Sequence, residues 1–218
     1  KFDLNHEKDK FISGIQKGQK FVIYIGLPSL IGLFFCAEDL ISTIFYRGAF
    51  TSMDVINSSY SLMAFSFGLP FFMLMKVLTP AFFARKDTKT PMYVALASLF
   101  LNVIFNYYLA FVLDYGHVGI AIGSSLAAII SVLTLEIVLY RDGFIKSKSI
   151  ENKFSFNVFI SSLFLITFLY FYTSEINFMK LTQVERIFYL SIEVLASVII
   201  YFSISRLMLN KSLRFLFD

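Results

Sequence analysis

Charged residues and cysteine are scarce in this 218-residue sequence, and each scarcity excludes a class of protein. Only 16% of the residues are Asp, Glu, Lys or Arg, and the mean hydropathy is +0.73. A typical soluble domain carries about 25% charged residues, so a soluble globular domain is excluded. The low charge and the 28 Phe exclude a disordered chain. The single cysteine, Cys36, excludes a disulfide scaffold. The absence of Trp carries no functional inference.

The usual chemistry of soluble enzymes is missing as well. The two histidines, His6 and His117, have no Cys, His or carboxylate at metal-ligand spacing, so we expect no metal site. We find no glycine-rich phosphate loop, zinc-protease helix or nucleophile elbow. We therefore expect no cofactor and no enzymatic activity, and this chain contains no ATPase domain of its own.

Long apolar runs dominate what is present. A bilayer core about 30 Å thick needs roughly 20 apolar residues in a helix, and six charge-poor runs meet that length. The sequence thus predicts an all-α, polytopic membrane protein with six transmembrane helices. The expected spans are Phe21–Ala37, Val55–Thr79, Met92–Leu113, Val118–Leu139, Phe154–Thr173 and Ile187–Ser205.

The distribution of Lys and Arg predicts the orientation. Segments 1–20, 80–91, 140–153 and 206–218 hold fifteen of these cations, whereas the segments on the other side hold Arg47, Lys180 and Arg186. The positive-inside rule places the cation-rich side in the cytoplasm, and with it both termini of this chain. Because topology explains nearly every cation, the net charge of +4 requires no nucleic-acid partner. No basic region with a cleavage site precedes the first run, so we expect no signal peptide.

Four parts follow from these spans. Residues 1–20 form a cytoplasmic segment, 21–140 a four-helix unit, 141–153 a cytoplasmic connector, and 154–218 a terminal hairpin with a cytoplasmic tail. Between the first two spans, Leu40, Ile41, Ile44 and Phe45 have the spacing of a short amphipathic helix at the outer interface. In the turn before the third span, we expect Thr90 to be an N-cap and Pro91 the first helical position.

Polar residues inside apolar spans are the main functional candidates, because they are costly in hydrocarbon. Lys76 either faces an aqueous cavity, where it attracts an anionic group such as phosphate, or snorkels to the cytoplasmic headgroups. Asn102 and Asn106, with Ser124 and Ser125 in the next span, either coordinate a monovalent cation or join helices by hydrogen bonds. Glu193 either pairs with a neighbour or is protonated, and a proton-coupling role is one interpretation of it.

Two expected spans contain the tripeptide Gly-Leu-Pro. Gly26 and Pro28 lie in the first span, and Gly68 and Pro70 in the second. A proline inside a helix removes one backbone hydrogen bond and bends the helix. These four residues are therefore hinge candidates, although bent helices also occur in static membrane proteins.

Three motifs resemble a known family. They are the segment 45–51 (FYRGAFT), the segment 68–91 from Gly-Leu-Pro to KVLTPAFFARKDTKTP, and Gly116–Gly119 with Ser125–Ala128. Together they are similar to the MurJ/MviN lipid II flippases of the multidrug/oligosaccharidyl-lipid/polysaccharide exporter superfamily. The resemblance is strong from about Gly26 to Ala128 and architectural from Phe154 onward. Its motif positions include Arg47, Gly48, Phe50, Asp87, Thr90 and Pro91.

The resemblance implies a 14-span protein with two lobes around a central cavity, in which the six spans correspond to spans nine to fourteen. It implies transport of an undecaprenyl-diphosphate-linked disaccharide peptide from the inner to the outer leaflet of the bacterial cytoplasmic membrane. The expected partners are that precursor, membrane lipids and an amino-terminal lobe, and Lys76, Arg85 and Lys89 are substrate-cavity candidates. We expect this chain to be a fragment that is inactive alone. The alternatives are a flippase for O-antigen or capsule units, or a truncated membrane scaffold.

Overall fold

The computed structural model of the chain describes residues 4–145 and 152–208, and all the regular structure in these ranges is helical. The elements are α1 (Leu4–Phe35), α2 (Ala37–Phe45), α3 (Ser52–Ser66), α4 (Leu69–Ala84), α5 (Lys89–Tyr107), the π-helical turn η1 (Tyr108–Val112), α6 (Gly116–Arg141), α7 (Asn152–Glu175), the 3₁₀ turn η2 (Phe178–Lys180) and α8 (Gln183–Met208). Five of the cations counted above lie outside the described residues, namely Lys1, Lys146, Lys148, Lys211 and Arg214.

The all-α, six-span prediction is confirmed. Six segments of the described chain are long and apolar enough to cross a membrane. They are Lys8–Phe35, Ser52–Ala84, Lys89–Val112, Gly116–Arg141, Lys153–Lys180 and Gln183–Met208. Each overlaps one expected span, because the apolar length that a bilayer requires is directly visible in the sequence.

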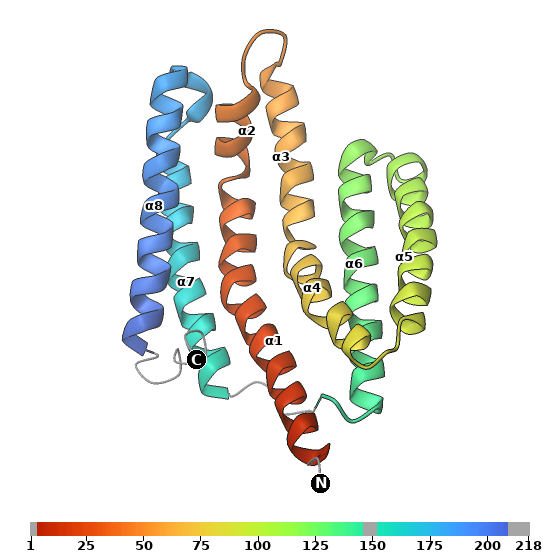
Figure 1. Cartoon of the computed structure of the whole chain (residues 1–218). Helices are drawn as coiled ribbons and strands as arrows, with labels where there is room; N and C mark the ends of the chain where they lie inside the picture. The colour runs from red at the N-terminus through yellow and green to blue at the C-terminus, as the bar shows by residue number, and fades with distance from the viewer. Residues whose placement is uncertain (1–3, 146–151, 209–218) are drawn as a thin grey trace.

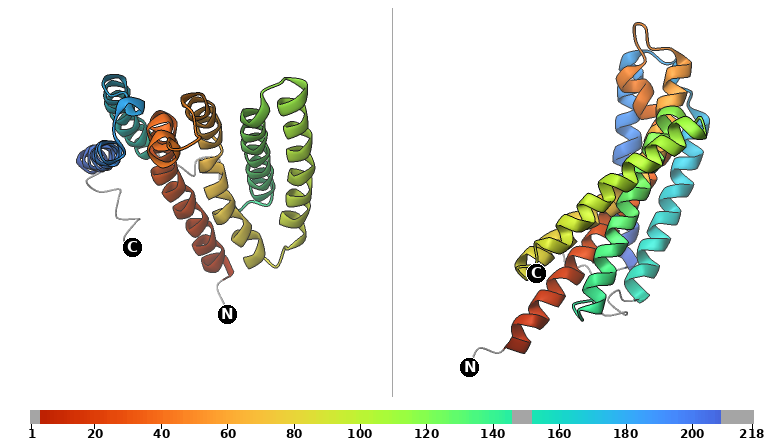
Figure 2. Two further views of the ribbon diagram at one scale, coloured as in Figure 1. Left: turned by 90° about the horizontal axis from the view of Figure 1, so that it is seen from above. Right: turned by 90° about the vertical axis from the view of Figure 1, so that its right-hand side faces the viewer.

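The helices lie roughly side by side, with one hairpin at each end of the row (Figure 1). The α7–α8 hairpin is at one end, the α5–α6 hairpin is at the other, and α1 to α4 lie between them, an order that is also visible from above (Figure 2). The start of α1, the α4–α5 turn, the end of α6 and the end of α8 all lie at the same end of the molecule (Figure 1). The described parts of the cation-rich segments are therefore gathered at one end of the molecule, which we call the inner end, and the opposite end is called the outer end.

The helix α1 is the centre of the packing. One buried cluster joins its outer half to α7 and α8 through Tyr24, Ile31, Leu165, Leu169 and Tyr201. A second cluster joins its inner half to α4 and α6, and it includes Ile15, Phe82, Val132, Leu135 and Leu139. Segment 1–20, which we expected only as a cytoplasmic segment, is helical from Leu4 and continues without a break into the first span.

The second span is not one bent helix, and here the expectation needs correction. It consists of α3 and α4, which are separated at Phe67 and Gly68, and Pro70 lies in the first turn of α4 instead of mid-helix. A proline is tolerated in a first turn because its missing N–H has no intrahelical acceptor there. In contrast, Pro28 lies inside α1, which remains helical on both sides of it.

The start of α5 also differs from the expectation. The helix begins at Lys89, so Pro91 is its third residue and Thr90 is not the N-cap. The capping side chain is Asp87, whose Oδ1 accepts a hydrogen bond from the Thr90 N–H at 3.0 Å and whose Oδ2 accepts one from the Thr90 hydroxyl at 2.7 Å. Asp87 reaches the helix because the chain turns at Lys86, whose φ is +62°.

The short helix expected after the first span is confirmed as α2, but its polar side is the buried one. Asp39, Ser42 and Thr43 are buried, whereas Ile44 and Phe45 are about half exposed. This orientation is reversed from that of a helix on a soluble protein. It is the arrangement expected where the outer medium is partly lipid and polar side chains find their partners inside the protein.

Candidate functional site

An apolar groove lies between α1 and α8, with α7 contributing to its wall. Its volume is about 460 Å³, and it is lined mainly by Pro28, Gly32 and Cys36 of α1, Leu165 of α7, and Val194 and Val198 of α8. The groove exists because α8 packs chiefly on α7 and α2 and touches α1 only slightly. Gly32 adds no side chain to the gap, and a Cβ built there meets nothing within 4 Å.

The inner end of this groove is closed by two buried tyrosines. The Tyr201 hydroxyl donates to the Tyr24 carbonyl oxygen at 2.8 Å, and the Ser205 hydroxyl donates to the Tyr24 hydroxyl at 2.9 Å. The rings of Tyr24 and Tyr201 are 5.6 Å apart. All three side chains are buried, so α8 is joined to α1 here by satisfied polar groups surrounded by aromatic rings.

A buried polar pocket lies at the outer end of the groove. Cys36 lines the groove and also interacts with Glu193 of α8 and Asp39 of α2. Burial raises the pKa of Asp39 to about 8, and the nearby carboxyl groups of Glu193 and Glu38 add to this shift. Burial and the Glu193 carboxyl also raise the pKa of the Cys36 thiol, so this cysteine is a poor nucleophile.

Arg186, near the start of α8, holds the outer ends of α2 and η2. Its guanidinium donates to the Phe178 and Tyr46 carbonyl oxygens at 2.8 and 3.0 Å and to those of Ser42 and Met179 at 3.3 Å. It also lies 4.7 Å from the centroid of the Tyr46 ring. Gln183, three residues earlier, donates to the Thr43 carbonyl oxygen at 2.7 Å. The last turn of α2 is the negative end of the helix dipole, so the positive charge of a buried Arg is favourable there.

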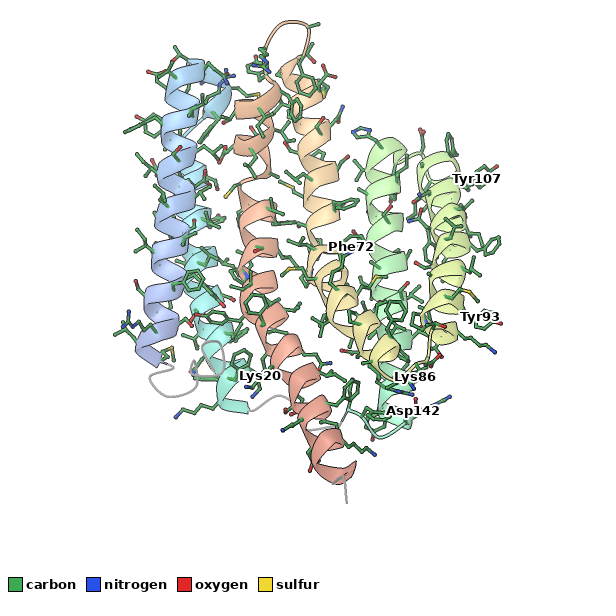
Figure 3. The ribbon with its side chains drawn as sticks, in the orientation of Figure 1. Lys20, Phe72, Lys86, Tyr93, Tyr107 and Asp142 are labelled. Carbon is green, nitrogen blue, oxygen red and sulfur yellow. The ribbon has the colours of Figure 1, made fainter. Side chains whose placement is uncertain are left out.

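The cavity candidates near the α4–α5 turn lie in different surroundings. Arg85 forms a salt bridge with Asp142 and stacks against Phe144, at 4.3 Å from the ring centroid. It therefore joins the end of α4 to the segment that follows α6, and Asp142 and Lys86 lie near this end of the molecule in Figure 3. Lys76 is exposed on the face of α4 opposite to its buried residues, and Lys89 is exposed at the start of α5. These three cations do not form one cluster.

The polar residues of α5 and α6 do come together. Asn102 Nδ2 donates to Ser124 Oγ at 3.2 Å, and Asn106 Nδ2 donates to Asn102 Oδ1 at 2.8 Å. With its amide turned over, Asn106 reaches the Ile120 carbonyl oxygen at 3.2 Å instead. The Asn102–Ser124 contact joins α5 to α6, whereas the Asn106–Asn102 contact lies within α5. Among the described residues, no group of three or more His, Cys, Asp or Glu is arranged to hold a metal ion.

Ser125 has a separate role at the break between α3 and α4. The Gly68 N–H bonds to Phe65, one residue out of helical register, which frees the Ala64 carbonyl oxygen. Ser125 Oγ donates to that oxygen at 3.0 Å. A Cβ at Gly68 would lie only 2.8 Å from the Ser125 hydroxyl. Two of the four hinge candidates lie in contact, because a Cβ at Gly26 would lie 3.4 Å from Pro70.

The motif between α2 and α3 forms a turn. Gly48 has φ of +62°, a conformation that favours glycine. Phe50 packs on Phe45 with ring centroids 5.9 Å apart, and Arg47 is exposed. Thr51 and Asp54 then form a capping box at the start of α3. These motif positions therefore fix the path of the chain into α3.

Sequence reasoning missed several residues of the groove and its ends. Arg186 was counted only as an outward cation, and Asp39 was not singled out. Tyr24 and Tyr201 look like ordinary apolar residues within their spans. The available signal was weak in each case, because at least one partner of each residue is more than 100 residues away in sequence.

Comparisons with known proteins agree with the resemblance found in the motifs. The family model described as "Lipid II flippase MurJ" matches residues 3–191. A protein of Vibrio cholerae named probable lipid II flippase MurJ is 37% identical over 64% of this chain and 26% of its own length. One of Haemophilus influenzae with the same name is 30% identical over 84% of this chain and 36% of its own length.

A solved structure of the lipid II flippase MurJ in an inward closed conformation also matches. It is 26% identical, and the superposition has a TM-score of 0.75 over 94% of this chain and 40% of that one. The chain therefore spans about a quarter to two fifths of the proteins to which it is similar.

Proposed function

The chain belongs to the lipid II flippase MurJ family, and on that premise we propose that it forms the carboxy-terminal part of such a flippase in the bacterial cytoplasmic membrane. Residues 21–140 would supply four helices of one lobe, 141–153 a cytoplasmic connector, and 154–218 the terminal hairpin and its tail. Both ends of this chain would face the cytoplasm. The rest of the transporter, including the amino-terminal lobe, would come from sequence outside these 218 residues.

The task of the complete flippase is physical. An undecaprenyl-diphosphate-linked disaccharide peptide must move from the inner to the outer leaflet while its polar headgroup stays out of hydrocarbon. Two lobes that rock around a central site accomplish this by alternating access. No covalent bond of the lipid changes, so the chain would act as a transporter without enzymatic activity.

The observation that carries this proposal is the groove between α1 and α8. It is almost wholly apolar, it is formed by the terminal hairpin together with the first helix of the lobe, and it has a volume of about 460 Å³. An apolar concavity suits part of a polyprenyl chain, since burial of apolar surface is favourable at about 25 cal/mol per Å². We assign the groove to the lipid tail.

Lys76 is our candidate for the diphosphate. It lies inside a span, and it is exposed on the face of α4 that packs on neither α1 nor α6. A cation there can attract the roughly two negative charges of a diphosphate, whose burial is costly without a partner. Arg85 is less suited to this role because Asp142 and Phe144 already occupy its guanidinium.

The test is complementation of a flippase-depleted strain. We expect this chain to insert into the membrane but not to rescue growth alone, because one wall of the cavity is absent. Co-expression with an eight-span amino-terminal piece should rescue growth. Lys76→Ala should weaken that rescue more than Lys86→Ala, since only Lys76 lies within a span. The proposal would be contradicted if the chain alone restored growth, or if growth were not restored even by co-expression with the amino-terminal piece.

The orientation can be tested in the same strain with Cys36 replaced by Ser. Single cysteines near Ser52, Tyr115 and Asn177 should react with an impermeant reagent added outside sealed cells. A cysteine near Lys86 should not react until the membrane is opened. Labelling of the Lys86 position in sealed cells would reverse the proposed topology.

A further inference from the structure

Glu193 is the most completely buried ionisable side chain in the described part of the molecule. Its exposed fraction is 0%, although it lies near the middle of α8, a helix that exposes apolar side chains on its other face. Neither of its carboxyl oxygens has a hydrogen-bond partner among the described residues. A buried carboxylate without partners is energetically costly, so this side chain has to be explained by something that it binds.

The group that faces it is another carboxyl. Asp39 of α2 is 5% exposed, and its Oδ2 also lacks a partner among the described residues. The two carboxyls interact with each other and with the Cys36 thiol, which lies between α1 and α2. The geometry thus brings two acids from distant parts of the chain into the buried polar pocket.

The other titratable groups around the pocket do not neutralise it. Tyr172 of α7 faces both acids, but its hydroxyl donates to the Tyr189 carbonyl oxygen at 3.0 Å. Glu38 adds a further acidic group next to Asp39. Arg186 lies two turns before Glu193, about 10 Å along α8, and its guanidinium is committed to four carbonyl oxygens.

We propose that Asp39 and Glu193 form a proton-binding site, in which one shared proton holds α8 against α2 and loss of that proton drives the two helices apart. Two carboxylates in one buried pocket repel each other and cannot both ionise without water or a cation. One proton between them restores a hydrogen bond and removes one charge. The site stands independently of lipid transport, because it requires only the α2–α8 contact.

The position of the site gives the proton a structural effect. Cys36 lies in the wall of both the pocket and the apolar groove. Separation of α8 from α2 would widen the outer end of the groove, while the Tyr24–Tyr201 contact keeps the inner end closed. Protonation would thus set the width of the groove at one end.

The first experiment is infrared spectroscopy of the 218-residue chain in lipid nanodiscs at neutral pH. The wild-type chain should show the carbonyl stretch of a protonated carboxyl group, and the double variant Asp39→Asn, Glu193→Gln should lose it. Both substitutions are isosteric with a protonated acid, so the fold should survive. Glu136→Gln is the matched control, because Glu136 is a half-buried acid on α6 that is bonded by Gln19 at 2.9 Å. It should leave that component of the band unchanged.

The second experiment measures thermal unfolding against pH. A group whose pKa is raised by folding stabilises the folded state in acid, and this stabilisation is lost as pH rises between the ordinary carboxyl pKa of about 4 and the raised value. Because the pKa of Asp39 is about 8, the unfolding temperature should fall from about pH 5 to about pH 9. The double variant should lack this slope. Retention of both the infrared band and the slope in the double variant would overturn the proposal, whether or not the chain takes part in lipid transport.

Discussion

The two hairpins at the ends of the helix row are attached to the molecule in different ways. In the α5–α6 hairpin, small residues of α6 let the two backbones approach closely. A Cβ at Gly119 would lie 2.6 Å from the Leu109 carbonyl carbon, and Gly123 is packed against Asn106. In the α7–α8 hairpin, α7 packs directly on α1, whereas α8 meets α1 across an apolar groove. Among the described residues, hydrogen bonds join α8 to α1 and α2 near the two ends of that groove.

This difference indicates which interface can open. Close backbone packing is lost entirely when two helices separate, because its many small contacts depend on distance. A groove with polar contacts at its ends can widen at one end while the other stays closed. We therefore infer that the α5–α6 hairpin moves as a unit and that the α8 side is the adjustable interface.

The α5 side is also the least covered part of the molecule. In the most apolar stretch of the span that contains α5, only 6% is buried, against 50% in the corresponding stretch of α6. Tyr93 and Tyr107 project from α5 away from all other helices, and their exposed fractions are 62% and 64% (Figure 3). In the complete transporter this face would meet lipid or the rest of the protein.

The largest effect should come from Gly119→Ala. The new methyl group would overlap the backbone of Leu109 and Ala110, which cannot move without disturbing the π-helical turn. We expect a destabilisation of about 3 kcal/mol, the upper part of the range for overpacking. Reversible unfolding by SDS in mixed micelles would measure it.

The control for that prediction is Gly14→Ala, at a helical glycine with nothing within 4 Å of its Cβ position. Replacement of glycine by alanine in an open helix should stabilise the chain by roughly 0.5–1 kcal/mol. Equal effects of the two substitutions would show that α5 and α6 are not closely packed.

Arg186→Met should have the next largest effect. It removes the donor for four carbonyl oxygens and the contact with the Tyr46 ring. We expect a loss of about 2 kcal/mol, since carbonyl groups left without donors in a buried site are costly. Arg47→Met, at an exposed arginine of the same end, should change stability by less than about 0.5 kcal/mol. If Arg186→Met were equally mild, α8 would not depend on this contact.

Gly32→Leu tests the groove itself. The leucine side chain would enter open space in the groove wall, so stability should change by less than about 1 kcal/mol. In the complemented two-piece flippase, we expect lipid transport to fall by about tenfold, which corresponds to a loss of 1.4 kcal/mol in tail binding. Gly14→Leu, which lies outside the groove, should not change transport. An unchanged rate for Gly32→Leu would remove the groove from the tail-binding role.

The spans were predictable because the bilayer imposes a length and a composition on each helix separately. Lys76, Glu193 and the Asn102–Asn106 pair were recognised for the same reason, since polar residues stand out in an apolar run. Asp39 was not recognised as a buried group, because it lies in a short polar stretch that also suits an exposed helix. Its partner Glu193 comes 154 positions later, and a local pattern contains no information on such pairing.

The breaks in the helices were also beyond local patterns. The sequence motif Gly-Leu-Pro occurs twice, yet Pro28 remains inside α1 and Pro70 lies in the first turn of α4. The difference comes from the neighbours: Ser125 of α6 supplies the donor that the broken α3–α4 backbone needs. Likewise, the cap of α5 moved from Thr90 to Asp87 because the turn at Lys86 has a positive φ.

The smallest effect that distinguishes the α5–α6 hairpin from the α7–α8 hairpin is expected from a substitution of Asp87. Its two hydrogen bonds with Thr90 hold the first turn of α5 and lower the pKa of the Asp87 carboxyl group. A lowered pKa stabilises the folded turn above the ordinary carboxyl pKa, and the contribution is lost as pH falls through the lowered value. Asp87→Ala should therefore speed amide exchange at Thr90 by about fivefold near neutral pH, the size expected for loss of a cap. The exchange of α8 amides should not change, because the α5–α6 hairpin has no part in the groove. A parallel increase in exchange at α8 would show that the two hairpins are coupled, and the division into a rigid and an adjustable side would then be wrong.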